Sequence, residues 1–119
     1  MATGAELLGT WLFAANGSLG AMVIYGVADS GAVSLRVGFG DAVLEDKWGA
    51  SWLPAERRIV MDRILPEGVT QNYTGYLGDN HAPYLSFGGL FTQSDSGDTP
   101  FGWSAEWRCP VLGTMVRVP

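Results

Sequence analysis

Residues 32–39 read Ala-Val-Ser-Leu-Arg-Val-Gly-Phe, and this stretch shows the periodicity of the chain most clearly. Val33, Leu35, Val37 and Phe39 fall on one side of an extended backbone, and the residues between them are serine, arginine and glycine. A two-residue apolar period indicates a β-strand with one buried face, because successive side chains of a strand point to opposite sides. The stretch therefore predicts a strand that covers an apolar core.

Similar short apolar runs lie on either side of this strand. Each run stops at or near glycine, proline, asparagine or aspartate, which favour tight turns, and no stretch keeps the apolar spacing of a long helix. The predicted strands are residues 7–14, 19–27, 32–39, 48–53, 58–65, 69–77, 84–91 and 101–107. We therefore expect an all-β chain, one domain over residues 1–119, folded as an eight-stranded antiparallel up-and-down β-barrel.

The composition excludes several classes of protein. Apolar residues make up 47% of the chain, which is too many for a disordered protein. The net charge of −5 argues against nucleic acid or an anionic membrane surface as a partner. No apolar segment reaches the length of about 18 residues that a membrane span needs, and the first residues lack the pattern of a signal peptide. We expect a cytoplasmic protein.

The first two predicted strands are apolar on both faces. Leu8, Leu12 and Ala14 lie opposite Trp11 and Phe13, so one of the two faces must be covered from outside a one-layer barrel. A second copy of the chain would cover it, and we expect a homo-oligomer, with a dimer favoured. The alternative is a β-sandwich or a distorted barrel whose own loops cover these residues.

Aromatic residues are the first candidates for a ligand site. Small residues separate large rings in two strands, so that the rings share one face of each strand and leave a slot between them. Such rings either bind a flat apolar ligand or plug the barrel as core residues, and both readings stay open. The candidate ligand-binding aromatics are Trp11, Phe13, Trp48, Trp52, Trp103 and Trp107.

A row of polar side chains lies in the sixth predicted strand. Asn72, Thr74 and Tyr76 share one face of residues 69–77. If this face points inward, the row would orient a ligand by hydrogen bonds in an otherwise apolar barrel. If it points outward, the row is a solvated surface.

Two acidic residues are the candidates for catalysis if the protein is an enzyme. Asp62 and Glu106 lie within predicted strands, and Arg63 follows Asp62 directly, so one of these two neighbours is expected to point inward. An inward carboxyl would serve as the acid or base of a cofactor-independent cyclase or isomerase acting on a hydrophobic intermediate. Whether the protein is an enzyme stays open.

The residues that metals and cofactors require are scarce. His81 is the only histidine and Cys109 the only cysteine, so neither a zinc site nor an intrachain disulfide is expected. No phosphate-binding or dinucleotide-binding glycine motif follows a predicted strand. We expect no metal and no cofactor. The role of residues 40–47, and of the possible edge strand Gly113–Val118, stays open.

Two segments resemble a known family of barrels. Leu8-Gly9-Thr10-Trp11, followed by the hairpin signal Asn16-Gly17, is similar to the opening of calycin barrels, and within them to the avidin/streptavidin type. Residues 101–107, Phe-Gly-Trp-Ser-Ala-Glu-Trp, resemble an inner strand of the same type. Phe13 stands where avidin-type proteins place an asparagine that binds the polar head of the ligand. The resemblance thus implies a barrel that encloses a ligand, without implying biotin.

These patterns together favour binding of a small, largely apolar ligand inside the barrel. The first alternative is the cyclase or isomerase that uses Asp62 or Glu106. The second alternative is a carbohydrate-binding module, with Trp48 and Trp52 exposed beside the loop Gly78-Asp79-Asn80.

Overall fold

The computed structural model describes residues 4–40, 44, 47–78 and 84–110. A short 3₁₀ helix precedes eight strands, and the bounds of the strands lie within a few residues of those expected from the apolar runs. The elements are η1 (Gly4–Leu7), β1 (Gly9–Ala15), β2 (Ser18–Val27), β3 (Val33–Phe39), β4 (Trp48–Leu53), β5 (Arg58–Ile64), β6 (Thr70–Leu77), β7 (Ser86–Gln93) and β8 (Phe101–Cys109). The expected loop residue His81, the segment Gly113–Val118 and most of residues 41–46 lie outside the described residues.

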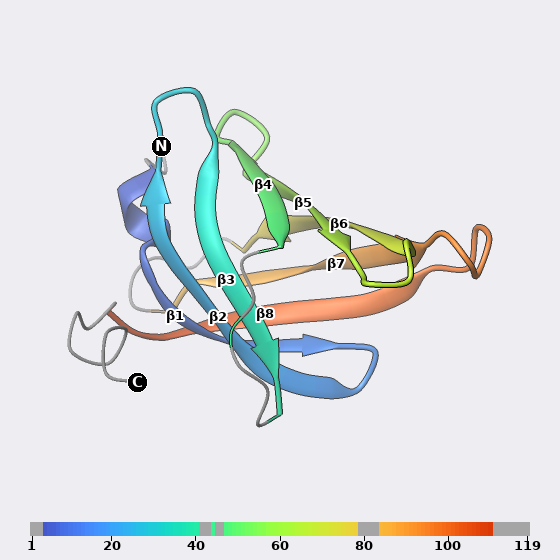
Figure 1. Ribbon diagram of the computed structural model, residues 1–119. Helices are drawn as coiled ribbons and strands as arrows, with labels where there is room; N and C mark the ends of the chain where they lie inside the picture. The colour runs from blue at the N-terminus through green and yellow to red at the C-terminus, as the bar shows by residue number, and fades with distance from the viewer. Residues whose placement is uncertain (1–3, 41–43, 45–46, 79–83, 111–119) are drawn as a thin grey trace.

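The eight strands form one antiparallel sheet in the order β3-β2-β1-β8-β7-β6-β5-β4. Strands that follow one another in the chain pair with each other, except β3 and β4, which lie at the two edges of the sheet, and β8 also pairs with β1 (Figure 1). Contact between β3 and β4 brings the two ends of the sheet together: Ala32 pairs with Ser51, and the backbone N–H of Trp52 donates to the carbonyl oxygen of Gly31 at 2.7 Å. The expected up-and-down β-barrel is therefore confirmed, and it is nearly closed.

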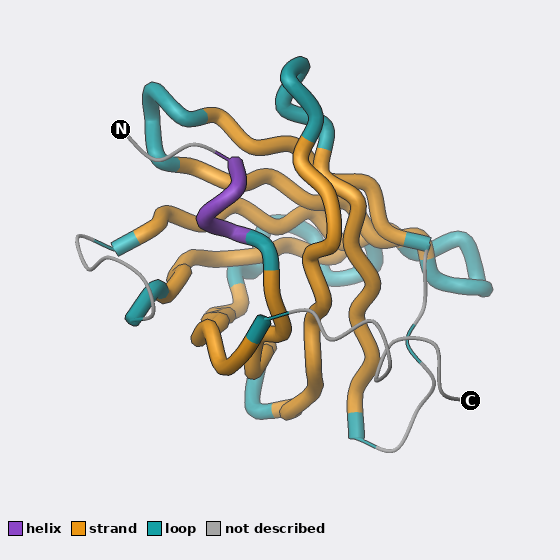
Figure 2. The backbone as a smooth tube through the Cα atoms, turned by 90° about the vertical axis from the view of Figure 1, so that its left-hand side faces the viewer, coloured by secondary structure: helices purple, strands orange, loops and turns teal. Residues whose placement is uncertain are grey.

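The two ends of the barrel are built differently. At one end η1 packs under the strands, and the indole N–H of Trp11 donates to the carbonyl oxygen of Leu7 at 3.0 Å (Figure 2). We call this the helix end. The opposite end, which we call the open end, carries the β1–β2 turn, where Asn16 and Gly17 adopt φ angles of 48° and 87°. These left-handed conformations are those of the tight hairpin turn that the Asn-Gly pair predicts.

Side chains alternate between the inside and the outside of the barrel along most strands. On β1, Trp11 and Phe13 are fully buried, whereas Leu12 between them is exposed. The expected alternation of Val33, Leu35 and Val37 on β3 is also observed. The buried apolar residues of all eight strands and of η1 form a single core cluster.

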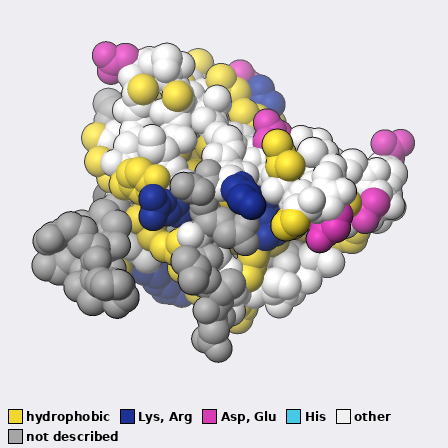
Figure 3. Space-filling model, viewed as in Figure 1, with side chains coloured by type: hydrophobic (Ala, Val, Ile, Leu, Met, Phe, Trp, Pro, Cys, Tyr) yellow, Lys and Arg dark blue, Asp and Glu magenta, His cyan; other side chains and the backbone are white. Residues whose placement is uncertain are grey.

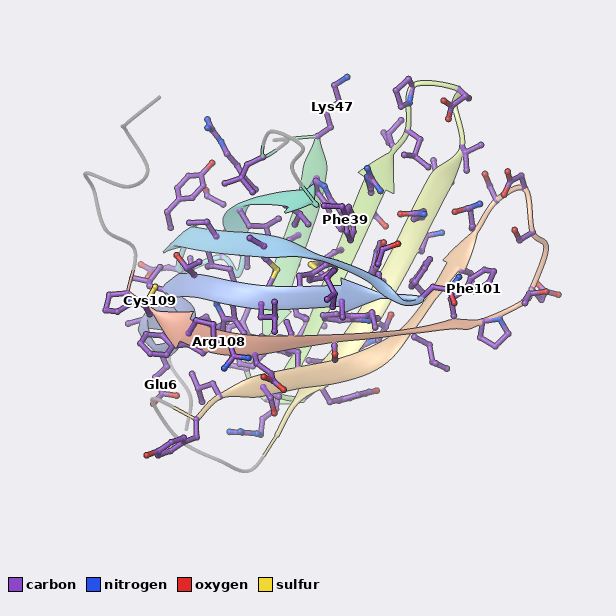
Figure 4. All side chains as sticks on the ribbon, turned by 90° about the horizontal axis from the view of Figure 1, so that it is seen from below. Glu6, Phe39, Lys47, Phe101, Arg108 and Cys109 are labelled. Atoms are coloured by element: carbon purple, nitrogen blue, oxygen red, sulfur yellow. The ribbon has the colours of Figure 1, made fainter. Side chains whose placement is uncertain are left out.

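Aromatic rings fill the middle of this core. The Phe13 ring lies 5.5 Å from the Trp103 ring, 5.9 Å from the Trp48 ring and 6.0 Å from the Tyr73 ring, measured between centroids. These partners come from β8, β4 and β6, so the contacts cross the inside of the barrel (Figure 4 shows the side chains there). A ligand among these rings, one of the two readings that the sequence left open, would require a central hollow. Instead the rings pack on one another, because eight strands enclose a space only just wide enough for side chains to fill it.

A glycine of β6 makes room for the Trp103 ring. Gly75 on β6 pairs with Gly89 on β7, and Gly89 pairs with Trp103 on β8. A Cβ atom at Gly75 would overlap the Trp103 ring, so the ring lies directly on the backbone of β6. Its indole N–H donates to the carbonyl oxygen of Thr74 at 3.1 Å, which satisfies a donor that would otherwise be buried alone.

Within the described part of the chain, no helix is long and apolar enough to cross a membrane.

Candidate functional site

The aromatic residues proposed as ligand walls are inside the barrel, as their spacing implied. Trp11, Phe13, Trp48, Trp52 and Trp103 are buried. Trp107 is half-buried, and its indole N–H donates to the carbonyl oxygen of Leu8 at 2.9 Å. The five buried rings contact other rings, as Trp11 does with Phe87 at 5.2 Å, and so they serve mainly as core residues. Trp48 and Trp52 do not form the exposed platform that the carbohydrate-binding alternative requires.

The polar row of β6 points away from the inside of the barrel. Asn72 and Tyr76 are exposed, and Thr74 shares their face. Their neighbours Gln71, Tyr73 and Leu77 are buried instead. The expectation that Asn72, Thr74 and Tyr76 orient a ligand inside the barrel is corrected here. The more apolar face of β6 is buried, which leaves the Asn-Thr-Tyr face to solvent.

The two candidate acids also lie on the outer surface. Asp62 and Glu106 are exposed, and one carboxyl oxygen of Glu106 accepts a hydrogen bond from the Arg108 guanidinium at 2.9 Å. Neither side chain faces the inside of the barrel, so the geometry gives no acid or base there from these two residues. Of the neighbours Asp62 and Arg63, Arg63 is the one that points inward, on the same face as Ile59 and Met61.

The open end of the barrel holds a cavity of about 300 Å³. Its lining combines aromatic rings with amide, hydroxyl and guanidinium groups, in contrast to the apolar core beneath it. The lining residues are Ala15, Asn16, Ser18, Phe39, Arg63, Gln71, Tyr73, Phe91 and Gln93. Phe39 lies at the end of β3 and turns toward the inside of the barrel, whereas Lys47 points away from it (Figure 4).

Four of these residues form a hydrogen-bonded set that we call the glutamine network: Arg63, Gln71, Tyr73 and Gln93. The Gln71 side-chain oxygen accepts from the Tyr73 hydroxyl at 2.8 Å and from an Arg63 guanidinium nitrogen at 3.5 Å. The Gln71 amide nitrogen donates to the Gln93 side-chain oxygen at 2.6 Å, and Gln93 in turn donates to the Asp95 carboxylate at 2.7 Å. The two donors on its oxygen fix the orientation of the Gln71 amide.

Two aromatic rings hold the Arg63 guanidinium in place. Its central carbon lies 5.3 Å from the centroid of the Phe39 ring and 5.5 Å from that of the Trp48 ring. A cation within about 6 Å of a ring face is attracted by the ring quadrupole. The Arg63 guanidinium is therefore held at the open end by Phe39 of β3 and Trp48 of β4 on one side and by Gln71 on the other.

Burial changes the acidity of the phenol in the network. Tyr73 is 2% exposed, and desolvation of the charged form raises its pKa from 10.0 to about 12, although the nearby Arg63 charge lowers it in part. Tyr73 is therefore a neutral hydrogen-bond donor at physiological pH. Among the described residues, Gln71, at 8% exposure, is the buried polar side chain that this donor serves.

A second hollow lies on the outside of the barrel. It measures about 700 Å³ and is lined by Lys47, Trp48, Gly49, Asp62, Ile64, Leu65 and Pro66, at the starts of β4 and of the β5–β6 turn. Although it is larger, its lining has few polar groups directed to a common point. The cavity at the open end is the better candidate site because several buried polar groups converge there.

The sequence patterns do not single out Gln71, Tyr73 or Gln93 as site residues, and they leave open whether Asp62 or Arg63 points inward. Both faces of β5 mix apolar and charged residues, Ile59 and Met61 with Arg63 and Val60 and Ile64 with Asp62, so alternation alone gives no signal that Arg63 points inward.

Comparison of the chain with protein-family models, with curated proteins and with solved structures gave no match. Among the described residues, no group of three or more His, Cys, Asp and Glu side chains lies close enough to hold a metal ion.

Proposed function

We propose that this protein binds a small molecule at the open end of the barrel, in the cavity beside the glutamine network. The observation that carries the proposal is the position of Gln71: a buried amide inside an otherwise apolar barrel, in the wall of a cavity. Burying polar groups costs free energy even when they are hydrogen-bonded to one another. Apolar residues at the same positions would give a simpler core, so a binding role accounts for the network.

The rings in the cavity lining supply the apolar part of the site. Tyr73 and Phe91 stack with centroids 4.5 Å apart and an angle of 20° between their planes, and Phe39 comes from β3. Flat rings of this kind bind a planar ligand by desolvating its faces. The proposed ligand is therefore small and partly apolar, and it lies at the open end of the barrel, above the packed ring core.

The test uses a bulky residue to fill the cavity. Gln93→Trp places an indole in the lining, and Thr92→Trp is the matched control, because Thr92 is the next residue on β7 and its side chain does not line the cavity. We use benzamide as the probe and follow binding by NMR titration of backbone amides. Binding to the unaltered chain should shift signals of cavity residues, Gln93→Trp should weaken binding at least tenfold, and Thr92→Trp should change it less than twofold. Equal affinity for both variants would exclude this cavity as the binding site.

We also propose that a second copy of the chain covers the outer face of β1 and β2. Residues 7–28 contain no charged side chain, and on this face Leu12 is 38% exposed and Leu19 62% exposed. Apolar side chains gather over β2 and β3 in the space-filling view (Figure 3). These strands add no charge of their own to the face, although Arg36 of β3 lies over the Tyr25 ring of β2 and Glu106 of β8 pairs with Leu12 at its border.

The dimer proposal predicts that one charge disrupts the interface. Leu12→Asp should convert the dimer into a monomer in sedimentation equilibrium at micromolar concentration, because a carboxylate would be buried without a partner. Leu90→Asp, on the outer face of β7 at 57% exposure, is the control and should leave the mass unchanged. A monomeric mass for the unaltered chain would exclude the proposal.

Two further assignments remain proposals. We propose that the barrel is of the calycin type, with the likeness to avidin-type proteins resting on Gly9-Thr10-Trp11 and on residues 101–107, and that the protein is cytoplasmic. The cyclase and carbohydrate-binding alternatives gain no support from the outward positions of Asp62 and Glu106 or from the burial of Trp48 and Trp52.

A further inference from the structure

We infer that the ligand of the open end is a neutral carbonyl compound with a single ring, such as an aryl ketone, amide or lactone, and that its carbonyl oxygen accepts from the Gln71 side-chain amide. This inference rests on the proposed function, since it names the class of ligand for the same cavity. Three properties of the site support it: the direction of its hydrogen bonds, the unused N–H group of Gln71, and the size and shape of the cavity.

The hydrogen bonds of the glutamine network all run in one direction. Arg63 can only donate and the Asp95 carboxylate can only accept, and the two glutamines lie between them. Gln71 therefore turns its oxygen toward Arg63 and Tyr73 and its nitrogen toward Gln93. Reversing the Gln71 amide would place its N–H groups against the Arg63 donor, so this orientation is fixed.

The Gln71 amide uses its full capacity to accept hydrogen bonds but not its full capacity to donate them. Its oxygen accepts from two groups, which is as many as a carbonyl oxygen has lone pairs. Its nitrogen carries two hydrogens, and the one bond that this nitrogen forms among the described residues is the donation to Gln93. Gln71 is 8% exposed and lines the cavity, so a molecule bound there can bring the acceptor for the remaining N–H.

The buried neighbours of Gln71 do not supply this acceptor. The Tyr73 hydroxyl donates its hydrogen to Gln71, and its oxygen is hydrogen-bonded to Arg63. Burial raises the pKa of Tyr73 to about 12, although the Arg63 charge and hydrogen bond lower it in part, so the phenol stays neutral at physiological pH. The Gln93 oxygen accepts the other hydrogen of the Gln71 nitrogen. In the buried part of the network, the ligand therefore meets a donor.

The charges beside the network favour a neutral ligand over an anion. The Arg63 guanidinium is engaged by Gln71 and by the Phe39 and Trp48 rings, and it has a further interaction within the protein. The inference therefore assigns no ligand charge to it. The Asp95 carboxylate accepts from Gln93 at 2.7 Å, so an anion at the two amides would bring like charges near one another. A carbonyl group offers the acceptor without a charge.

Size and shape limit the body of the ligand to a single ring system. A volume of about 300 Å³ corresponds to about ten water molecules at about 30 Å³ each, which leaves room for one ring with a short substituent. Phe39, Phe91 and Tyr73 supply ring faces, on which a flat ring can lie with its carbonyl group directed to Gln71. Asn16 and Ser18 also line the cavity, but both are exposed, so water serves their polar groups and they place no demand on the ligand.

The experiment compares acetophenone with α-methylstyrene, in which a CH₂ group replaces the carbonyl oxygen and the shape is kept. Both are titrated by NMR at pH 7 against the unaltered chain, Gln71→Met and Asn72→Leu. Gln71→Met keeps the length of the side chain and removes its N–H groups, and Asn72→Leu removes the exposed amide of the next residue on β6 as the matched control. Gln71→Met should weaken acetophenone at least fivefold and α-methylstyrene less than twofold, because only the carbonyl compound loses a hydrogen bond. Asn72→Leu should weaken neither ligand more than twofold.

A second measurement does not depend on a variant. In the unaltered chain, acetophenone should move one of the two Gln71 side-chain amide protons further downfield than α-methylstyrene does, since the ring of each ligand acts on this proton alike and only acetophenone accepts from it. A circular dichroism spectrum and a melting temperature for each variant establish that the barrel is folded.

The outcomes separate the two proposals. Equal losses of affinity for both ligands in Gln71→Met, or equal shifts of the Gln71 amide protons with both ligands, would overturn the carbonyl assignment. If Gln93→Trp still weakens both ligands in that case, the binding site itself stays in place. Failure of acetophenone, α-methylstyrene and benzamide alike to bind the unaltered chain would overturn the proposed function as well.

Discussion

Replacing Phe13 by alanine is expected to lower the free energy of unfolding by about 3–5 kcal/mol. Phe13 is fully buried, and its ring contacts rings from β3, β4, β6 and β8. Removing it takes away the transfer free energy of the ring and leaves a cavity among large aromatic neighbours that cannot close it easily. The effect should appear as a lower midpoint in urea unfolding, with an unchanged slope.

Leu90→Ala is the control for this change. Leu90 is 57% exposed on the outer face of β7, so the same kind of truncation there should cost less than about 0.5 kcal/mol. A loss below 1 kcal/mol for Phe13→Ala would contradict the finding that the rings fill the inside of the barrel. The site residues would then have to be reconsidered, because a central hollow would be available after all.

Stability at alkaline pH is expected to depend on Tyr73. Its pKa is 10.0 in an ordinary environment and about 12 in the folded protein, so above pH 10 the unfolded chain loses a proton that the folded chain keeps. The stabilisation from the buried neutral phenol is complete below pH 10 and is lost as the pH rises toward 12. The unaltered chain should therefore lose about 2 kcal/mol through this residue by pH 12.

Comparison with phenylalanine variants isolates this contribution. Tyr73→Phe should start less stable at pH 7 by about 1 kcal/mol, through loss of the hydrogen bond to Gln71, and should then lose less stability between pH 10 and 12. Tyr76→Phe, at an exposed position on the same strand, should follow the unaltered chain. Identical alkaline slopes for all three proteins would show that the Tyr73 phenol is not buried.

Much of the barrel could be predicted from the sequence because the signals for its strands and turns lie in short continuous stretches of residues. The Asn16-Gly17 pair allows a tight turn, and the alternation in residues 32–39 gives both the strand and its buried face. Consecutive strands joined by short turns pair as neighbours, so the order of the sheet follows from the order of the chain. On β1, the large rings of Trp11 and Phe13 also indicated the inner face.

The candidate site could not be predicted in the same way, because its position depends on how distant strands pair. On β6 both faces carry residues that could be buried, and only the pairing of Tyr73 with Met61 and Phe91 on the neighbouring strands shows which face is inside. For Asp62 and Arg63, alternation showed that the two diverge but not which one points inward. The network further joins residues from β5, β6 and β7, whose distances in space depend on the register of all three strands.

The central hollow that ligand binding among the aromatic rings would require is filled by the rings themselves. The spacing of the tryptophans correctly placed them inside, but spacing does not show whether rings from opposite walls meet. The Trp103 ring lies on Gly75 and contacts the Phe13 and Phe87 rings in the middle of the barrel. The cavity therefore lies at the open end, where Ala15 and Ser18 contribute small side chains to the wall.

The side-chain amide signals of Gln71 and Gln93 in a ¹⁵N correlation spectrum give the most direct test of ligand binding at the glutamine network. Adding benzamide at pH 7 should shift these two pairs of signals together with the backbone signals of Arg63 and Phe39, and should leave the side-chain amide of the outward-facing Asn72 unchanged. Shifts confined to Asn72 and the outer faces, or no shifts in the network at saturating benzamide, would contradict a binding site at the open end.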